Sequence, residues 1–439
     1  MTDIGDSKKL TDPHLGPVES GERISVIDSL RGVALLGILS MNIYFFAMPG
    51  FAYFSPRAYG GAEGLNLVVW AITNMFCNLK FMAIFSMLFG AGFLIMSERA
   101  ESRGVPVGPV YYRRTLWLLV IGLIHSYLIW IGDILVPYAV CGLLLFLFRK
   151  LSAKGLLISA VIVLSVGFIS ITGGVLFFDF ARTQSQLHEE AVEAGEKPED
   201  LQVEMHEAWT EIKTEMFTHN EDIEEEVEAY RGGYTDILKF RIPRVIEMQT
   251  MAIPFYLLWR AGGLMLLGMS LLRRGILSGQ KSKGFYLKMM ILGYALGLPL
   301  TIYDSYFLYI HEFDQIYKIG LPFNYVGSIA VALGHVGLVM LICKSGWLNA
   351  LMARLAAVGR MALTNYLMQS ILCTTFFYGY GLGLYGHLER STQFLVVFAV
   401  WILQLIYSPI WLKHFRFGPA EWLWRSLTYW KIQRFRKEA

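Results

Sequence analysis

Long apolar segments recur along the whole chain and determine its predicted architecture. A transmembrane helix needs about 20 mainly apolar residues. The segments that meet this length are 26–49, 65–97, 109–131, 133–149, 155–179, 249–272, 285–308, 322–343, 356–379 and 392–412. We therefore predict an all-α fold, a polytopic transmembrane helix bundle of about 10 spans with both termini on the same side.

The second apolar segment is too long for one simple crossing. Asn74, Asn78 and Lys80 interrupt it, and polar side chains are unfavourable in the hydrocarbon region. We expect residues 65–78 to lie at the interface or to re-enter the membrane. The run "FMAIFSMLFGAGFLIM", which follows, is expected to make the crossing.

Composition supports an integral membrane protein. The 439 residues are 55% hydrophobic and 17% charged, with a mean hydropathy of +0.47, whereas soluble domains carry about 25% charged residues. We divide the chain into a polar N-terminal tail, a first transmembrane group, an acidic helical insertion, a second transmembrane group and an aromatic, basic tail. These parts are residues 1–25, 26–179, 180–245, 246–412 and 413–439.

Basic residues predict the orientation. With both termini cytoplasmic, the inner segments hold 25 Lys and Arg, whereas the short outer loops hold only Arg57, Lys318 and Arg390. This asymmetry is what the positive-inside rule predicts. The first 25 residues are polar and lack the apolar core of a cleaved signal peptide, so none is expected.

Two polar segments flank or interrupt the spans. Residues 181–240 carry 17 acidic and 5 basic residues. Charge runs are usually solvated faces, so we favour a helical hairpin outside the membrane over a lid or a recruitment surface. The C-terminal run "EWLWRSLTYWKIQRFRK" predicts an amphipathic helix at the inner membrane surface, which could also help to cover a cytoplasmic site.

Several kinds of chemistry find no support. Cys77, Cys141, Cys343 and Cys373 lie in or beside apolar segments without paired spacing, so they indicate neither disulfides nor a zinc site. The sequence contains no Walker loop, HExxH motif or dinucleotide fingerprint. We therefore expect no metal cofactor, no ATP hydrolysis and no nucleic-acid partner.

Ionisable residues within the spans are candidate functional groups, because each costs about 2.5–3.5 kcal/mol on insertion scales. Asp28 and Arg31 are three residues apart and can pair on one helix face. Arg260 lies midway through its span and must face a polar interior, a carboxylate or an anion; Asp304 is its candidate partner. Lys80 is a further candidate. Structural ion pairs would explain these residues equally well.

His125 and Asp133 form a candidate acid–base pair near the outer end of the third span. A histidine exchanges protons near neutral pH, and a carboxylate can fix its tautomer. The alternative is that His125 has a packing role only. His335, in the eighth span, has the same two explanations, with less support for a role in catalysis. No Ser, His and Asp set has a spacing that suggests a catalytic triad.

Five motifs in this order resemble signatures of the YeiB-like family of bacterial multi-span membrane proteins. They are "DSLRGVALLGILSMN", "FSMLFGAGF", "GLIHSYLIWIGDILVPYAVCG", "GRMALTNYLMQS" and "FGPAEWLWRSLTYWK", and the resemblance extends from about residue 23 to residue 431. It implies a location in the bacterial cytoplasmic membrane.

The first motif also resembles the opening helix of heparan-α-glucosaminide N-acetyltransferase, which is grouped with the transmembrane acyltransferases. Asp28, Arg31, Gly32 and Asn42 match its pattern. The resemblance implies acyl transfer from cytoplasmic acyl-CoA to an extracytoplasmic hydroxyl or amine acceptor. Residues 43–60 lack the histidine that follows the Asn in the mammalian enzyme, so His125 would supply the base from another helix.

Under this hypothesis His125 is the base, Asp133 orients it and Asn42 donates a hydrogen bond to the developing oxyanion. Arg31 and Arg260 would line the path of the acyl-CoA donor. Arg113 and Arg114, with Arg273 and Arg274, could hold the CoA phosphates, although each could equally reflect the positive-inside bias.

Two other functions stay open at this point. A secondary transporter of a small polar or anionic solute could use mid-membrane Arg260 and Asp304 as a substrate or proton site. A membrane scaffold could recruit a partner through the acidic insertion, but it leaves the buried polar groups unexplained. In each case the lipid bilayer is a partner, and assembly as a homo-oligomer is compatible with the sequence.

Overall fold

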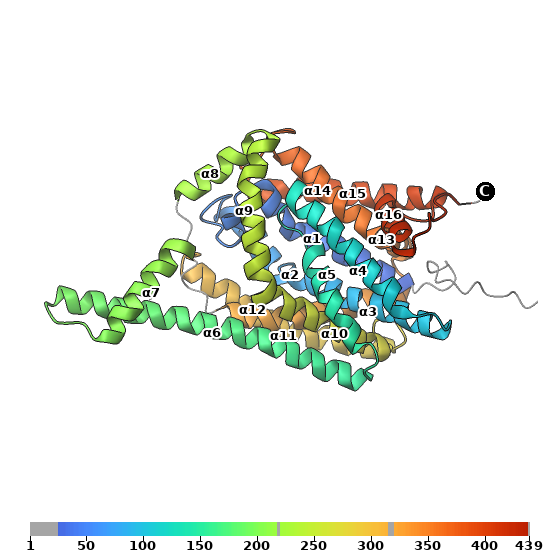
Figure 1. The fold of residues 1–439 in the computed structure, drawn as a ribbon, viewed down its shortest axis with the longest axis horizontal. Helices are drawn as coiled ribbons and strands as arrows, with labels where there is room; N and C mark the ends of the chain where they lie inside the picture. The colour runs from blue at the N-terminus through green and yellow to red at the C-terminus, as the bar shows by residue number, and fades with distance from the viewer. Residues whose placement is uncertain (1–24, 217–219, 315–319, 438–439) are drawn as a thin grey trace, which may run out of the picture.

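The computed structural model describes residues 25–216, 220–314 and 320–437, which fold as helices joined by short connections (Figure 1). The helices of the first half are α1 (Ser25–Ala47), α2 (Gly64–Phe76), α3 (Lys80–Ser102), α4 (Val107–Ile124), α5 (Leu135–Leu145), α6 (Ala153–Glu193), α7 (Asp200–Met216) and α8 (Asn220–Arg231). Those of the second half are α9 (Tyr234–Ala252), α10 (Leu258–Arg273), α11 (Lys283–Ile310), α12 (Leu321–Ser345), α13 (Asn349–Arg360), α14 (Ala362–Phe377), α15 (Arg390–His414) and α16 (Pro419–Tyr429).

Short 3-10 and π-helical turns complete the fold. The π-helical turns η3 (His125–Ile129) and η5 (Ile253–Leu257) follow α4 and α9, and the 3-10 turns are η2 (Gly50–Tyr53) and η4 (Phe146–Phe148). Within the described residues no β-strand forms, and the only bridge joins Phe415 to Arg436. The all-α prediction is therefore confirmed.

Seven of the described helical segments are long and apolar enough to cross a membrane. They are α1, α2 with α3, α6, α9 with α10, α11, α12 and α15. The other predicted spans coincide with the shorter helices α4, α5 and the pair α13–α14. The segments thus fit a polytopic membrane protein, and the number of crossings stays a prediction.

The second apolar segment is divided where the sequence places its polar residues. α2 ends at Phe76, and Leu79, which has a left-handed backbone with a φ of 65°, directly precedes α3. A non-glycine residue with positive φ is uncommon, and it turns the chain sharply between the two helices. The break thus falls within the Asn74–Lys80 interval that we expected to interrupt the segment.

Small residues allow neighbouring helices to approach closely. A Cβ atom on Gly32 of α1 would overlap the backbone carbonyl of Leu355 in α13, and one on Gly268 of α10 would overlap that of Met87 in α3. Transmembrane helix interfaces are rich in such small residues because lipid supplies no hydrophobic driving force for helix association. The contact between α1 and α13 joins two helices that form the site described below.

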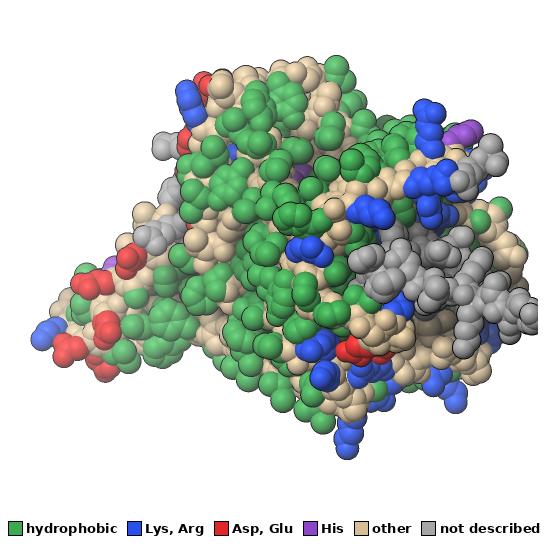
Figure 2. Space-filling view, turned by 45° about the vertical axis from the view of Figure 1, so that its right-hand side comes forward, with side chains coloured by type: hydrophobic (Ala, Val, Ile, Leu, Met, Phe, Trp, Pro, Cys, Tyr) green, Lys and Arg blue, Asp and Glu red, His purple; other side chains and the backbone are tan. Residues whose placement is uncertain are grey.

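The two ends of the bundle differ in charge. Helix α6 continues beyond its apolar part, and α7 packs back along it, so that the pair projects from the bundle (Figure 1). Acidic side chains gather on this projection, whereas Lys and Arg gather at the opposite end of the visible face (Figure 2). We call the end formed by α7 and α8 the acidic end, and the end where α1 starts the basic end.

The predicted segment boundaries fall inside continuous helices. Residue 180 lies within α6, and residue 245 lies within α9, which continues through η5 into α10. The charge composition changes at these positions, but the helical pattern continues through them. The predicted boundaries of the acidic insertion are therefore not boundaries of secondary structure. The predicted N-terminal tail, residues 1–25, lies outside the described residues except for Ser25.

Candidate functional site

A cavity of about 280 Å³ enters the bundle from the basic end. Its walls come from α1, α3, α4, α5, α13, α14 and α16. Along α1 it extends from Ile27 to Ile38, which is about 16 Å at 1.5 Å per residue. This volume is close to the lower end of the range for ligand pockets, roughly 300–1,000 Å³, so the cavity suits a narrow, elongated group.

Charge and hydrophobicity change along this cavity. The polar part carries two acidic side chains, Asp28 and Glu421, and five arginines: Arg31, Arg99, Arg114, Arg360 and Arg425. The deeper part is mainly apolar and is lined by Ile38, Phe85, Leu118, Ile134, Leu135, Tyr138 and Tyr366. An anionic head with a narrow apolar extension matches this distribution.

Two of the predicted binding residues, Asp28 and Arg31, lie at the cavity mouth. Arg31 Nη1 donates to Asp28 Oδ1 over 2.8 Å, and both side chains stay partly exposed. Because an exposed ion pair contributes only about 0–1 kcal/mol, Arg31 can exchange this partner for a ligand anion at little cost.

The C-terminal helix α16 forms one wall of the cavity. Trp424 stacks on the Arg114 guanidinium at 3.8 Å and donates from Nε1 to the Arg114 carbonyl oxygen over 2.8 Å. Glu421 accepts hydrogen bonds from the backbone N–H groups of Leu363 (2.6 Å) and Thr364 (3.1 Å) at the start of α14. The aromatic tail therefore lines the cavity, and its predicted place at the inner membrane surface stays a prediction.

Arginines that are adjacent in sequence occupy different environments. Arg114 lines the cavity, whereas Arg113 packs over the Trp430 ring at 5.8 Å and lies outside the lining. Arg273 donates to the Arg149 and Leu151 carbonyl oxygens, also outside it. Of the four arginines predicted to hold phosphates, Arg114 alone lines this cavity; Arg113, Arg273 and Arg274 do not.

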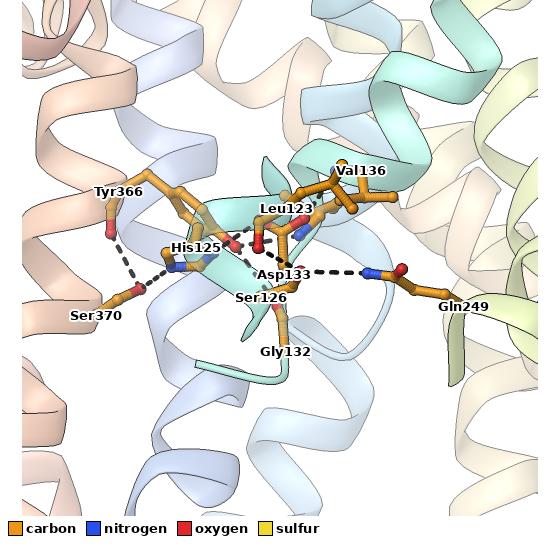
Figure 3. A network of polar contacts seen from close by, with 10 residues as sticks. Leu123, His125, Ser126, Gly132, Asp133, Val136, Gln249, Tyr366 and Ser370 are labelled. Atoms are coloured by element: carbon orange, nitrogen blue, oxygen red, sulfur yellow. Dashed lines mark hydrogen bonds and ion pairs between the residues drawn. The ribbon is translucent and has the colours of Figure 1, made fainter. Parts of the chain in front are cut away.

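Beyond the cavity, His125 joins two residues in a buried chain of hydrogen bonds (Figure 3). Its Nδ1 lies 2.7 Å from Asp133 Oδ1, and its Nε2 lies 2.9 Å from Ser370 Oγ. His125 and Ser370 are each 1% exposed, and Asp133 is 6% exposed. This is the arrangement of a Ser–His–Asp triad, which is recognised by geometry and not by sequence position.

Local backbone structure brings His125 and Asp133 together. The helix α4 widens into η3 at His125, and the extended backbone of Trp130 ends it. Asp133 then places its second carboxylate oxygen 2.7 Å from the Val136 backbone N–H, at the start of α5. The carboxylate thus caps one helix while it contacts the histidine of another, and the predicted His125–Asp133 contact is present.

Ser370 was missed by the sequence analysis. It lies on α14 in the motif "GRMALTNYLMQS", 245 residues from His125. No spacing along the chain signals this contact, because it depends on how α14 packs beside η3. Its hydroxyl also has a local acceptor, the Tyr366 carbonyl oxygen at 3.4 Å, as serines within helices often do.

Tyr366 separates the cavity from the triad. It lines the cavity, and its ring centroid is 5.1 Å from that of His125. Its hydroxyl accepts from the Ile134 N–H over 3.2 Å and donates to the Gly132 carbonyl oxygen at 3.4 Å.

Asn42 lies on the cavity face of α1, one turn beyond Ile38. It is half-buried, and no hydrogen bond of its side chain occurs among the described residues. One turn further, Phe46 stacks on Trp130 at 4.0 Å, and Trp130 packs edge-on against His125 at 6.2 Å. Asn42 therefore lies between the inner end of the cavity and the surroundings of His125.

The other predicted binding residues form a separate buried cluster between α2, α3, α10, α11 and α12. Lys80 Nζ donates to the Asn74 carbonyl oxygen (2.7 Å) and to Asn324 Oδ1 (3.2 Å). Asn324 Nδ2 donates in turn to Asp304 Oδ2 (2.9 Å). All four side chains are buried, and they lie outside the lining of the arginine-rich cavity.

The proposed Arg260–Asp304 pair is wrong. Arg260 donates instead to the Tyr325 carbonyl oxygen (3.1 Å) and to Ser328 Oγ (2.7 Å), and its guanidinium lies 4.6 Å from the Tyr325 ring centroid. Both residues contact α12, but at different positions. Asp304 accepts from the Asn324 side-chain amide, whereas Arg260 donates to Tyr325 and Ser328, so the two charged groups do not pair directly.

His335 has a packing role that its contacts explain. Its Nδ1 lies 2.8 Å from the Tyr294 hydroxyl, and its Nε2 lies 2.9 Å from the Phe76 carbonyl oxygen. Both ring nitrogens thus contact groups of the protein, and neither of these groups is a carboxylate. His335 does not line the arginine-rich cavity.

Fold and site together define the class of protein: a polytopic membrane helix bundle with a buried polar centre and an arginine-rich cavity. The chain belongs to the family of the proteins YxaH and YeiB. It is 33% identical to the uncharacterized protein YxaH of Bacillus subtilis (strain 168) over 97% of this chain and 98% of the relative. It is 31% identical to the uncharacterized protein YeiB of Escherichia coli (strain K12) over 93% and 96%.

A family model described as "Protein of unknown function (DUF418)" matches residues 271–431. This range contains Tyr366, Ser370 and Glu421 but not His125. A third relative, described as an uncharacterized 39.9 kDa protein in the amylase 3' region of Bacillus acidopullulyticus, is 28% identical over 94% of this chain. No solved structure matches the chain.

Proposed function

We propose that this protein is a membrane-embedded acyltransferase, which moves an acyl group from acyl-CoA at the basic end to a hydroxyl or amine acceptor that arrives from the acidic end. The observation that carries the proposal is the cavity: its arginine-rich mouth leads into an apolar part lined by Tyr366, and the Tyr366 ring packs against His125 of the Ser370–His125–Asp133 chain. The positive-inside rule supports a cytoplasmic position for the basic end.

The cavity mouth suits the charged part of the donor. Five arginines and two carboxylates leave an excess of three positive charges around it. Guanidinium groups bind phosphates through paired hydrogen bonds, and CoA presents several phosphates. Arg31 and Arg114 approach the mouth from different helices, which would fix the head group while the narrow pantetheine chain extends inward.

The apolar part of the cavity suits the acyl thioester. Its residues contribute few competing polar groups, so the thioester would be desolvated beside Tyr366. Electrostatic interactions are stronger in such a water-excluded site than in water. We propose that rotation of Tyr366 brings the thioester carbonyl carbon to Ser370 Oγ, and that Asn42 donates a hydrogen bond to the oxyanion as it forms.

The triad would act in two steps. In the first, Ser370 Oγ forms a bond to the thioester carbonyl carbon and passes its proton to His125 Nε2; the C–S bond breaks, and the CoA sulfur leaves with that proton. In the second, the acceptor gives its proton to His125 and attacks the acyl-serine, and Ser370 regains the proton. Asp133 holds the His125 tautomer whose Nε2 is free to accept a proton.

A solute transporter is the competing function, and its specific observation is the buried Lys80–Asn324–Asp304 cluster. Intramembrane ionisable groups can mark a transport path. However, the protein's own amide and carbonyl groups hydrogen-bond these side chains, and the cluster lies outside the arginine-rich cavity. We therefore assign it a packing role.

Binding of acyl-CoA tests the proposal without knowledge of the acceptor. The thermal midpoint of the purified protein would be measured with CoA, with a series of acyl-CoAs and with an equal ionic strength of sulfate. A ligand at a hundredfold excess over its Kd adds about 2.7 kcal/mol to stability. We expect acyl-CoA to raise the midpoint, and Arg114→Gln to weaken this effect.

Arg113→Gln is the matched control, because it removes the same charge one residue away from the cavity lining. Its response to acyl-CoA should equal that of the wild type. Equal loss in both variants would indicate attraction by overall charge only. No midpoint shift with any acyl-CoA, in folded protein, would instead favour the transporter.

A further inference from the structure

Three buried side chains with unused hydrogen-bond donors lie on the side of the triad that faces the acidic end. Arg241 of α9 is 0% exposed, yet within the described residues none of its three guanidinium nitrogens makes a hydrogen bond of ordinary geometry, although the Tyr230 hydroxyl lies within range of its charge. The Tyr378 hydroxyl and Trp130 Nε1 are likewise buried without partners. Such groups are rare in native proteins, where buried polar atoms are nearly always hydrogen-bonded.

These donors belong to one region of the molecule. The Arg241 guanidinium lies 5.9 Å from the Tyr378 ring centroid, and Tyr378 and Trp130 belong to the same cluster of buried side chains. Trp130 packs against His125. The cluster therefore borders the triad directly, on a side that the arginine-rich cavity does not reach.

Contacts of α9 place Arg241 opposite η3. Tyr234, seven residues before it, donates from its hydroxyl to the Leu128 carbonyl oxygen over 2.8 Å. Gln249, eight residues after it, donates to Ser126 Oγ over 3.2 Å (Figure 3). Residues seven or eight apart share a helix face, so Arg241 lies on the face of α9 that contacts η3.

The surrounding protein leaves the Arg241 charge without a direct counter-ion. The half-buried carboxylate of this region, Glu226, accepts from the Gly50 N–H (3.0 Å) and from the Tyr385 hydroxyl (2.9 Å). Among the described residues, no ion pair joins it to Arg241. An unpaired buried charge is strongly unfavourable, and an anion with several acceptor oxygens would remove that penalty.

We propose that Arg241, with Tyr378 and Trp130, binds an oxyanion, a carboxylate or a phosphate, carried by the acceptor. This assignment to the acceptor rests on the proposed acyltransferase function; binding of the anion itself does not. The site would hold an acceptor by its charged group while its hydroxyl or amine approaches Ser370 from the side opposite acyl-CoA. Arginine suits this role because its planar fork of donors matches carboxylate and phosphate oxygens.

The decisive variant is Arg241→Met, which keeps an unbranched apolar side chain and removes the charge. If Arg241 lacks a partner in the unliganded protein, this substitution should raise the thermal midpoint in anion-free buffer, because it removes an uncompensated buried charge. Arg244→Met is the matched control: this residue lies on the same helix, with its guanidinium 3.4 Å from the Phe240 ring centroid.

Anion binding is then measured without any CoA, so that the result is independent of acyl transfer. Inorganic phosphate and glucose 6-phosphate would be titrated against protein in a nonionic detergent. Nanodiscs of phosphatidylglycerol and of phosphatidylcholine form the lipid arm. We expect at least one phosphate source to raise the midpoint of the wild type and of Arg244→Met. Arg241→Met should weaken that affinity roughly 10- to 100-fold through the loss of charge-assisted hydrogen bonds.

Each outcome decides the proposal. A response to soluble phosphates identifies a water-soluble acceptor, whereas a response confined to phosphatidylglycerol nanodiscs identifies an anionic lipid. A lower midpoint or loss of folding in Arg241→Met, with recovery in Arg241→Lys, would mean that Arg241 has a packing role, and the proposal would be wrong. An unchanged phosphate response in Arg241→Met would also overturn it.

Discussion

Asp133 supports two elements of the site, so its replacement should affect stability and chemistry separately. Its carboxylate accepts from the Val136 N–H and contacts His125 Nδ1, each over 2.7 Å, in a buried environment. In Asp133→Ala both of these groups lose their acceptor. A hydrogen bond to a charged group contributes about 1.5–3 kcal/mol, and removal of the carboxylate also relieves its own burial, so we expect a net loss of roughly 2–4 kcal/mol.

Asp133→Asn should behave differently. Its amide oxygen can still accept from the Val136 N–H, so the stability should lie within about 1 kcal/mol of the wild type. Its amide nitrogen, however, would face His125 Nδ1 as a donor. The imidazole would then carry its proton on Nε2 and could no longer accept one from Ser370, so acyl transfer should be lost although the fold is retained.

Two measurements check this prediction. Reversible unfolding in mixed detergent micelles gives the free energy of unfolding of each variant. Nitrogen-15 NMR of the histidine side chains gives the tautomer, with the His125 signal assigned from His125→Gln. The reasoning is refuted if Asp133→Ala stays within about 0.5 kcal/mol of the wild type, or if Asp133→Asn leaves the His125 tautomer unchanged.

Three further predictions concern packing, pH and the second polar cluster. Gly32→Val places a side chain against the Leu355 carbonyl of α13, so it should lower the unfolding free energy by about 1–3 kcal/mol or prevent folding; a midpoint equal to that of the wild type would contradict the close approach of α1 and α13. Burial raises the pKa of Glu226. The folded chain therefore keeps this proton where the unfolded chain has lost it, and the contribution of Glu226 to stability falls as the pH rises through the folded pKa. The stability of the wild type relative to Glu226→Gln should thus decrease between about pH 4 and about pH 8, and a difference that does not change with pH would argue against this. Lys80→Met and Asp304→Asn should each destabilise the protein, the former by about 3–5 kcal/mol because it leaves a buried carboxylate uncompensated. The double variant should lose less than the sum, and strict additivity in this cycle would exclude coupling through Asn324.

The all-helical fold and its long apolar segments could be predicted from sequence because they depend on local properties. Apolar length predicts spanning helices whatever surrounds them, and the interruption between Asn74 and Lys80 predicts the break at Leu79. Such features follow from the hydrocarbon environment, which imposes the same requirement on every segment. Boundaries of the acidic insertion depend instead on where helices stop, and charge alone does not determine that.

The candidate site was only partly predictable, for the same reason. The contacts Asp28–Arg31 and His125–Asp133 join residues close in sequence, and both are present. Ser370 reaches His125 from another helix, and no local pattern indicates that. Arg260 and Asp304 were paired because both are charged and lie at mid-membrane, yet helix packing directs them to different positions of α12.

The covalent intermediate provides the most direct test of the central claim. Purified protein would be incubated with acyl-CoAs of increasing chain length in the absence of acceptor, and both CoA thiol release and the intact protein mass would be followed. We expect one acyl group per chain, located by peptide mapping at Ser370, with no addition in Ser370→Ala or His125→Gln. If the folded wild type neither releases CoA nor gains an acyl group with any donor, the triad is not an acyl-transfer site and the proposed function is wrong.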